Sequence, residues 1–235
     1  GGHFPNKRIP LARIDEIQHI IDKYVYISDH SESSQTGSLG KIQAWLWSIA
    51  ACEIEEALSL PRRERGLIEF MYSELEARVQ VEDRKGRRVP LSNDEKTLQM
   101  YVAVQKALFK LDQSTISYHL LEKFFPDWRS PSQDTLSNVS QNLAQLHTKI
   151  RGIFEHPYSE KFYQLAEKYD TAYLILGDII SDDPEGASEL LENHAEFEEA
   201  IRSIYDQRLS RLRGRIGRAA FYSTLSVFLT KISIA

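Results

Sequence analysis

Apolar side chains recur at three- and four-residue steps along nearly the whole chain, and this spacing limits the possible folds more than any other feature. Such steps place the apolar residues on one side of an α-helix, whereas a half-buried strand alternates apolar and polar residues. The first stretch, about residues 10–28, carries Ile14, Ile17, Ile20, Ile21 and Tyr24 at these steps. We therefore expect an all-α protein, a multi-helix bundle of about eight helices.

The same pattern predicts further helices over residues 40–59, 62–78, 93–112, 114–125, 132–155 and 159–181, and again from residue 187. The segment from Ser92 to Glu95 is a strong helix start, because a capping hydroxyl is followed by acids in the first turn. Residues 78–91 contain alternating valines and could form one short β-hairpin; a frayed helix end followed by a loop is the alternative. Loosely repeated helix lengths also allow a helical-repeat-like array, although the sequence has no fixed period.

Composition divides the chain into four segments. Residues 1–28 hold an N-terminal helix, residues 29–40 a flexible Ser/Gly-rich loop, residues 41–218 the main helical domain, and residues 219–235 an apolar C-terminal segment. A length of 235 residues suffices for a sizeable buried core. The single cysteine, Cys52, excludes an intrachain disulfide, and its apolar neighbours in the sequence indicate a small core residue.

The charge of the chain changes sign in its last third. Residues 155–200 contain thirteen acids and two bases, whereas residues 201–218 contain six arginines and one acid. At about 100° per residue, four of these arginines share one stripe of a helix: Arg208, Arg211, Arg215 and Arg218. We expect this stripe to contact a membrane surface or an anionic partner; the alternative is that it pairs with the acids of residues 182–199 or is hydrated.

The apolar segment after the arginines carries a second candidate contact surface, formed by Phe221, Leu225, Phe228, Leu229 and Ile232. We expect these side chains to face a membrane or a partner. The segment would then be the start of a truncated membrane span, and the coding sequence would continue into further apolar residues. The alternative is a soluble helical-repeat adaptor, in which the same stripe is buried within the chain.

Candidate groups for chemistry are few, and each has a plainer structural explanation. Glu16 and His19 have the Glu-x-x-His spacing of di-iron bundles, but such sites need two copies and the chain holds one. Glu53, Glu55 and Glu56 interrupt an apolar helix, and we expect that end of the helix to reach solvent.

Two further sets of charged residues lack the spacing of a known binding motif. The acids between residues 178 and 189 do not alternate as in a calcium-binding loop, so we expect a solvated turn. The basic runs Arg62–Arg65 and Arg84–Arg88 could contact phosphate, but neither carries the interleaved aromatic residues of a single-strand binding groove. Since the net charge is also −5, we expect no nucleic acid partner.

The sequence contains no Gly-rich phosphate loop, no nucleophile elbow and no His-Glu-x-x-His motif, so it predicts no catalytic, cofactor-binding or metal-binding residue. We expect a non-enzymatic helical interaction or scaffold domain, the soluble part of a longer membrane-attached protein. It would lie on the cytoplasmic side and bind a protein partner or a membrane. An enzyme with no recognisable motif is the alternative. It would require two or more of five side chains to converge in one pocket: His19, Glu53, Glu56, His119 and Asp178.

Overall fold

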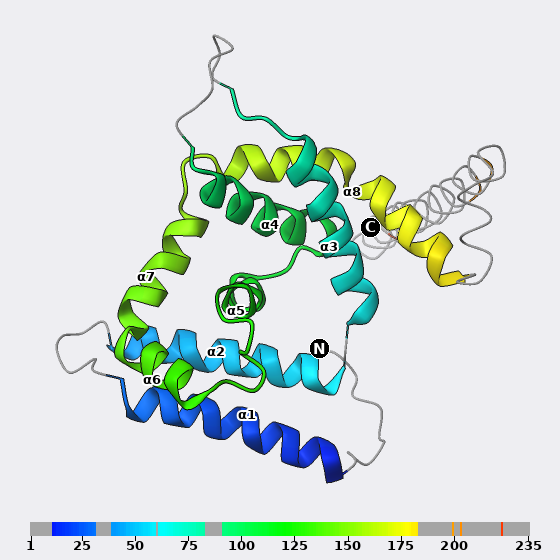
Figure 1. The fold of residues 1–235 in the computed structure, drawn as a ribbon. Helices are drawn as coiled ribbons and strands as arrows, with labels where there is room; N and C mark the ends of the chain where they lie inside the picture. The colour runs from blue at the N-terminus through cyan, green and yellow to red at the C-terminus, as the bar shows by residue number, and fades with distance from the viewer. Residues whose placement is uncertain are drawn as a thin grey trace, which may run out of the picture. The chain divides into compact units, whose positions relative to one another are not determined.

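A computed structural model describes residues 11–31, 39–59, 61–82 and 91–182, together with the single residues Glu199, Ser203 and Tyr222. Within these ranges the protein is all-α, which confirms the prediction from the apolar spacing (Figure 1). The helices are α1 (Leu11–Asp29), α2 (Leu39–Leu58), α3 (Arg62–Arg78), α4 (Asn93–Phe109), α5 (Gln113–Phe124), α6 (Gln133–Gln141), α7 (Leu143–Phe154) and α8 (Ser159–Asp182). The chain divides into two compact units, residues 1–170 and 171–235, and the cavity and surface described below belong to the first.

Helix boundaries agree closely with the predicted ones, and the two main differences have local causes. α4 ends at Phe109, because Lys110 adopts the left-handed conformation (φ 51°, ψ 37°) that stops a helix. The helix predicted over residues 132–155 is two helices, since the backbone of Asn142 (φ −108°, ψ 18°) leaves the helical region between α6 and α7. The expected hairpin lies partly outside the described residues; of those described, residues 79–81 form no strand and Glu82 forms only an isolated bridge.

α5 is the central helix of the first unit. Its residues Ile116–Leu121 are all buried, so the helix is covered from every side. α2 packs against α5 and also contacts α1 and α7, whereas α3 packs on α4 (Figure 1). α1 contacts α2 and α6. This order places α2 between α1 and α5, so that side chains of α2 reach both neighbours.

α1 buries only part of the apolar stripe that the sequence predicts. Ile20, Tyr24 and Ile27 are buried. Ile14 and Ile21 are 49% and 37% exposed, because they lie on the side of α1 away from these buried residues. The helix therefore has apolar residues on its outer side as well as on its inner side.

The residues predicted to contact a membrane or an anionic partner lie outside the described residues: Arg208, Arg211, Arg215, Arg218, Phe221, Leu225, Phe228, Leu229 and Ile232. Among residues 208–232, Tyr222 is described, and it is helical and exposed. None of the described helices has the length and apolar character that a bilayer span requires. The contact roles of the arginine stripe and the apolar stripe therefore stay predictions.

The start of α4 allows a test of local stability. Ser92 Oγ accepts a hydrogen bond from the Glu95 backbone N–H at 3.2 Å, and the Glu95 carboxylate accepts one from the Ser92 backbone N–H at 2.9 Å. We expect Ser92→Ala to lower the free energy of unfolding by about 1 kcal/mol, because the Glu95 N–H loses its acceptor. Urea denaturation measures this change, with Ser73→Ala on the exposed side of α3 as the control. An equal loss in both variants would contradict the capping role.

Candidate functional site

A lysine and a glutamate form a buried ion pair between α1 and α2. Lys23 Nζ lies 2.6 Å from Glu53 Oε1, and the two side chains are 1% and 4% exposed. Glu53 Oε2 accepts a hydrogen bond of 2.8 Å from the Tyr24 hydroxyl. Lys23 also donates to the Trp128 carbonyl oxygen at 2.8 Å, which ties the turn between α5 and α6 to α1. The prediction that Glu53 reaches solvent is therefore wrong, since side chains of α1 bond both of its oxygens.

Aromatic rings complete the surroundings of the Lys23 ammonium group. Its nitrogen lies 4.8 Å from the centroid of the Trp128 ring and 5.3 Å from that of the Tyr24 ring. Both distances are within cation–π range. Burial lowers the pKa of Lys23 from its ordinary value, although the charge and hydrogen bond of Glu53 oppose this effect. Burial also raises the pKa of Tyr24 well above its ordinary value, so its hydroxyl stays a donor to Glu53 at neutral pH.

A second polar network lies about one helical turn further along α2, centred on Glu56. Glu56 Oε1 lies 2.5 Å from His119 Nε2, and Glu56 Oε2 accepts hydrogen bonds from Arg65 Nε and Nη2 at 3.1 and 2.6 Å. The other ring nitrogen of His119 lies 2.5 Å from Gln105 Oε1. Because Gln105 Nε2 donates to the Tyr101 carbonyl oxygen at 3.1 Å, Gln105 Oε1 is the acceptor from His119. Both ring nitrogens of His119 are therefore bonded, one to Glu56 and the other to Gln105.

Arg65 connects this network to a second carboxylate, that of Glu122 on α5. Arg65 Nη1 lies 2.7 Å from Glu122 Oε2. Arg129 Nε and the Tyr118 hydroxyl donate to Glu122 Oε1 at 2.8 and 2.9 Å. Burial alone would raise the pKa of Glu122 and of Glu56, but the charges and hydrogen bonds of their partners outweigh it, and both pKa values are lowered. Both carboxylates are therefore ionised at neutral pH.

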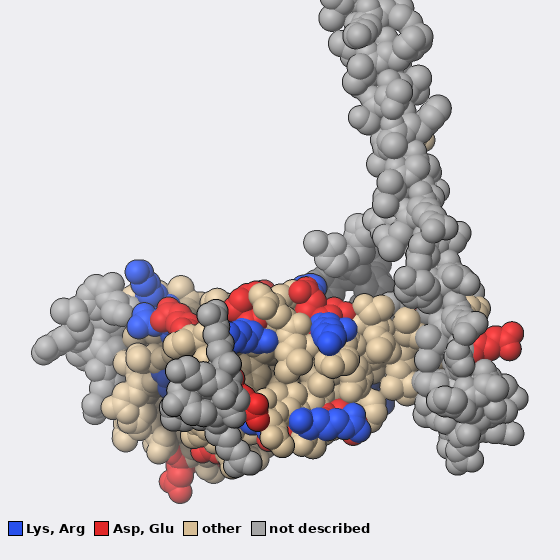
Figure 2. All heavy atoms as spheres, turned by 90° about the horizontal axis from the view of Figure 1, so that it is seen from above, with Lys and Arg blue, Asp and Glu red and all other residues tan. Residues whose placement is uncertain are grey.

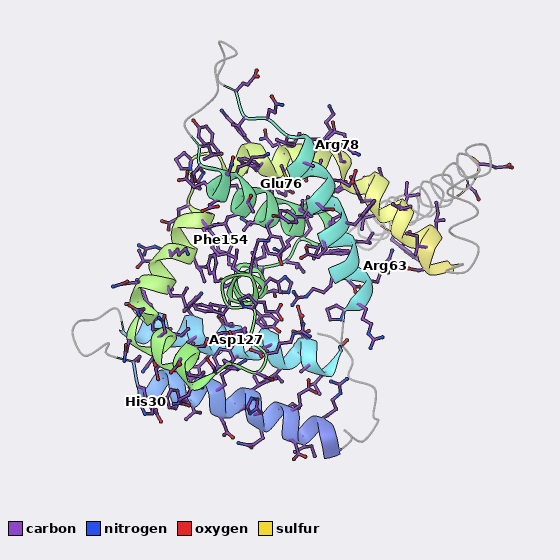
Figure 3. The ribbon with its side chains drawn as sticks, in the orientation of Figure 1. His30, Arg63, Glu76, Arg78, Asp127 and Phe154 are labelled. Atoms are coloured by element: carbon purple, nitrogen blue, oxygen red, sulfur yellow. The ribbon has the colours of Figure 1, made fainter. Side chains whose placement is uncertain are left out.

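The turn between α5 and α6 is held by its own hydrogen bonds. Asp127, labelled in Figure 3, accepts through Oδ2 from the Ser132 backbone N–H at 3.1 Å and from Thr135 Oγ1 at 2.8 Å. The Ser130 backbone N–H donates to the Asp127 carbonyl oxygen at 2.9 Å. These bonds fix the backbone on both sides of Arg129, whose side chain is then directed to Glu122.

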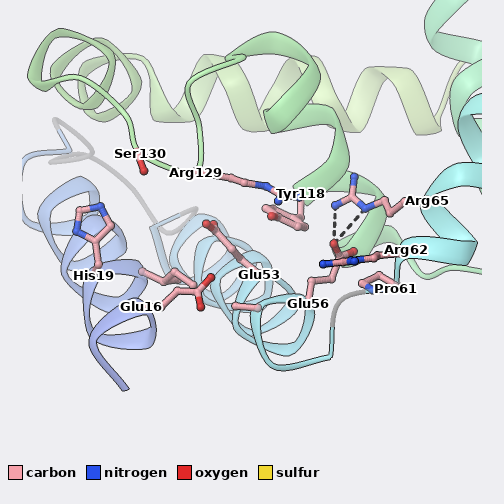
Figure 4. Close-up of a pocket in the computed structure, with 12 residues that line it drawn as sticks. Glu16, His19, Glu53, Glu56, Pro61, Arg62, Arg65, Tyr118, Arg129 and Ser130 are labelled. Carbon is pink, nitrogen blue, oxygen red and sulfur yellow. Dashed lines mark hydrogen bonds and ion pairs between the residues drawn. The ribbon is translucent and has the colours of Figure 1, made fainter. Parts of the chain in front are cut away.

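The two networks border a cavity of about 440 Å³ between α1, α2, α3 and the α5–α6 turn (Figure 4). Its lining includes three acids and three arginines: Glu16, Glu53, Glu56, Arg62, Arg65 and Arg129. His19, Tyr118 and Ser130 add further polar groups. Half of the lining residues are thus charged, and these come from three helices and one turn.

Two of the three arginines of the cavity retain free donors, whereas its carboxylates are paired. Glu16 pairs with Arg13 at 2.8 Å, and Glu53 and Glu56 have the partners given above. Arg62 has no hydrogen-bond or ion-pair partner among the described residues, and Arg129 uses Nε alone, which leaves both terminal nitrogens available. α3 also begins at the cavity without a side-chain cap on its first N–H groups.

Three of the five side chains that an enzyme site would require converge in this cavity. His19, Glu53 and Glu56 line it, whereas His119 bonds to Glu56 without lining it. Asp178 belongs to the second unit. The convergence meets the condition derived from the sequence. It does not by itself supply catalysis, because all four oxygens of Glu53 and Glu56 already accept hydrogen bonds.

Of the three arginines that line the cavity, sequence reasoning noted two and missed one. Arg62 and Arg65 belong to a basic run that the sequence analysis noted, but nothing in the sequence signals Arg129. Its partner Glu122 lies seven residues earlier, across a turn whose course the sequence does not specify. Cys52 is not an activated nucleophile, because burial raises the pKa of its thiol.

In the described part of the chain, no three His, Cys, Asp or Glu side chains gather closely enough to hold a metal ion. On the face shown in Figure 2, basic and acidic side chains are interspersed, without a continuous basic surface among the coloured residues. Comparisons of the chain with protein-family models, with curated proteins and with solved structures find no match. The geometry of the cavity therefore carries the functional inference.

The Lys23–Glu53 pair provides a prediction about stability. We expect Lys23→Met to lower the free energy of unfolding by about 3–5 kcal/mol, because it leaves a buried carboxylate without its cation. The double variant Lys23→Met/Glu53→Gln is expected to be more stable than Lys23→Met alone, since its buried pair carries no charge. Urea denaturation of Lys23→Met, Glu53→Gln and the double variant, with the exposed Lys41→Met as the control, measures these differences. A double variant as unstable as the sum of its two single variants would contradict the pairing.

The lowered pKa values of Glu56 and Glu122 provide a prediction about acid unfolding. A carboxylate whose folded pKa is lowered contributes stability above its unfolded pKa of about 4.3, and this contribution is lost as the pH falls through the folded pKa. Arg65→Met removes a cation from both carboxylates. We therefore expect its acid unfolding midpoint, followed by circular dichroism, to rise by about 0.5–1 pH unit. The exposed Arg151→Met is the control, and an unchanged midpoint in Arg65→Met would contradict the assignment.

Proposed function

We propose that the chain is a non-enzymatic binding domain whose cavity receives an anionic group, a carboxylate or a phosphate, of its ligand. The observation that carries this proposal is the set of free donors at the cavity: the whole guanidinium group of Arg62 and both terminal nitrogens of Arg129. A guanidinium group matches the planar geometry of carboxylate and phosphate oxygens and donates to them in pairs.

The unpaired charge in the cavity lining is positive, which favours an anionic ligand, because each lining carboxylate already has a cation. Glu16 faces Arg13, Glu53 faces Lys23, and Glu56 faces Arg65. The ring of His119 adds a further donor to Glu56. The cations that remain for a ligand are those of the arginines with unused nitrogen atoms.

The hydrogen bonds of the lining carboxylates favour binding over catalysis, and the volume of the cavity suits a small ligand. General acid–base catalysis needs a group that is free to exchange a proton with the substrate, but the oxygens of Glu53 and Glu56 are saturated by fixed partners. The volume, about 440 Å³, is within the range of small-molecule sites and suffices for one small ligand or one side chain of a partner.

Attachment to a membrane or partner through residues 219–235 remains part of the proposal. Its support comes from the sequence: a basic stripe followed by an apolar stripe. An interaction domain of this kind would hold its ligand in the first unit and its attachment segment at the other end of the sequence.

Inorganic phosphate is the first probe for the cavity. We expect it to raise the melting temperature of the protein relative to sodium chloride at equal ionic strength. At ten times the dissociation constant, the stabilisation is about 1.4 kcal/mol, or roughly 3–6 °C for a chain of this size. Arg62→Ala should abolish the shift without affecting the fold, because Arg62 has no partner among the described residues.

Arg63→Ala is the matched control, since it removes the same charge from the same end of α3 outside the cavity lining. It should retain the phosphate shift. Acetate, tested in the same way, distinguishes a carboxylate site from a phosphate site. The proposal fails if neither anion stabilises the protein, or if Arg63→Ala loses the shift as completely as Arg62→Ala.

A further inference from the structure

The outer face of α1 has the residue pattern of a helix that packs against another helix. Ile14, Gln18, Ile21 and Val25 follow each other at steps of four, three and four residues, which is the a/d spacing of a coiled-coil seam. The three apolar members are 49%, 37% and 38% exposed. We call these four residues the α1 seam. Because single exposed apolar residues are ordinary but an aligned row is not, the seam indicates a contact surface.

A row of aspartates runs beside the seam. Asp15, Asp22 and Asp29 are exposed and lie seven residues apart, so they fall on one side of the helix. Asp15 and Asp22 directly follow Ile14 and Ile21, which are the d positions of the seam. In heptad terms they occupy the e positions, whose charge selects the partner helix. Asp22 accepts a hydrogen bond from Gln18 of the seam at 2.7 Å, and Asp15 and Asp29 have no ion-pair partner among the described residues.

The basic residues of α1 do not neutralise this row. Lys23 is buried in its pair with Glu53. Arg13 pairs with Glu16 and donates to the Ala57 carbonyl oxygen of α2 at 2.5 Å. The outer face of α1 therefore combines an apolar seam with unopposed negative charge.

We propose that the α1 seam docks an amphipathic helix of a partner protein, with lysines or arginines flanking its apolar stripe. The apolar residues of such a helix would cover Ile14, Ile21 and Val25. Its basic residues would pair with the three aspartates, which are spaced to meet one cation per heptad. This surface is separate from the cavity and does not depend on the anion-binding proposal.

Two other occupants fit the surface less well. A second copy of the chain presents the same acidic row and has no basic residue on this face of α1 to meet it. An anionic membrane surface would repel the aspartates beside the seam. A basic helix satisfies the apolar seam and the acidic row together.

A designed peptide provides the probe. It is a three-heptad helix with leucine at a and d and lysine at e and g, labelled with fluorescein, and fluorescence anisotropy measures its binding to the whole chain. We expect micromolar affinity that weakens as salt increases. A second peptide with glutamate in place of lysine should not bind, because its charges face the aspartate row.

Two variants of the chain locate the contact. Ile14→Ser/Ile21→Ser should raise the dissociation constant about tenfold or more, because both apolar contacts are lost. Asp15→Asn/Asp22→Asn should raise it severalfold and reduce its dependence on salt. Phe70→Ser on α3, where the side chain is 46% exposed, is the apolar control, and Glu69→Gln is the charge control; both should bind as the unchanged protein does.

Circular dichroism of each variant verifies that it is folded, which is expected because the substituted side chains are exposed. Failure of the lysine peptide to bind, or equal binding of the glutamate peptide, would overturn the proposal. Equal loss of binding in Phe70→Ser would show attraction without a defined site and would overturn it as well. Sedimentation velocity showing that the protein forms a dimer which Ile14→Ser/Ile21→Ser dissociates would assign the seam to a second copy instead.

Discussion

The bonds of the Lys23 ammonium group are the constraint on which the arrangement of α1, α2 and the α5–α6 turn depends. The group donates to Glu53 on α2 and to the Trp128 carbonyl oxygen in the turn, and the rings of Tyr24 and Trp128 lie within cation–π distance. Removing two charges from water costs several kcal/mol per ion, and the mutual attraction repays it only when the geometry is good. Apolar contacts between the same elements tolerate sliding and repacking, whereas these directional bonds hold for one register only.

The second network connects α2 to α3 and α5 through directional bonds of the same kind. Glu56 lies one helical turn after Glu53, so the two carboxylates project from neighbouring positions of α2. Glu53 is bonded by α1, and Glu56 is bonded by Arg65 of α3 and His119 of α5. The acidic end of α2 thereby joins three helices. Each carboxylate has a matched cation, so the polar groups at the centre of the unit determine how its helices are positioned.

The fold was largely predictable from the sequence, and the site only in part. Helical spacing and capping residues are local, so most helix limits and the Ser92 cap followed directly from the residues. The error on Glu53 came from a contact that is not local: its cation lies 30 residues away, and that cation's second acceptor lies 105 residues away. A glutamate within an apolar helix is compatible with a solvent-exposed end or with a buried pair, and only the tertiary contact distinguishes the two. Arg129 was missed for the same reason.

The charge of the cavity illustrates why a count of its charged residues is a poor guide to its ligand. Three acids and three arginines line it, which sums to no net preference. The preference arises from which hydrogen-bonding atoms are already used: each acid is paired with another cation of the chain, while Arg62 and the end of Arg129 retain their donors. The same reasoning applies to α1, where the two basic residues are used by the fold and the outer aspartates are not. One helix thus borders a site that favours anions and carries on its outer face a surface that favours cations.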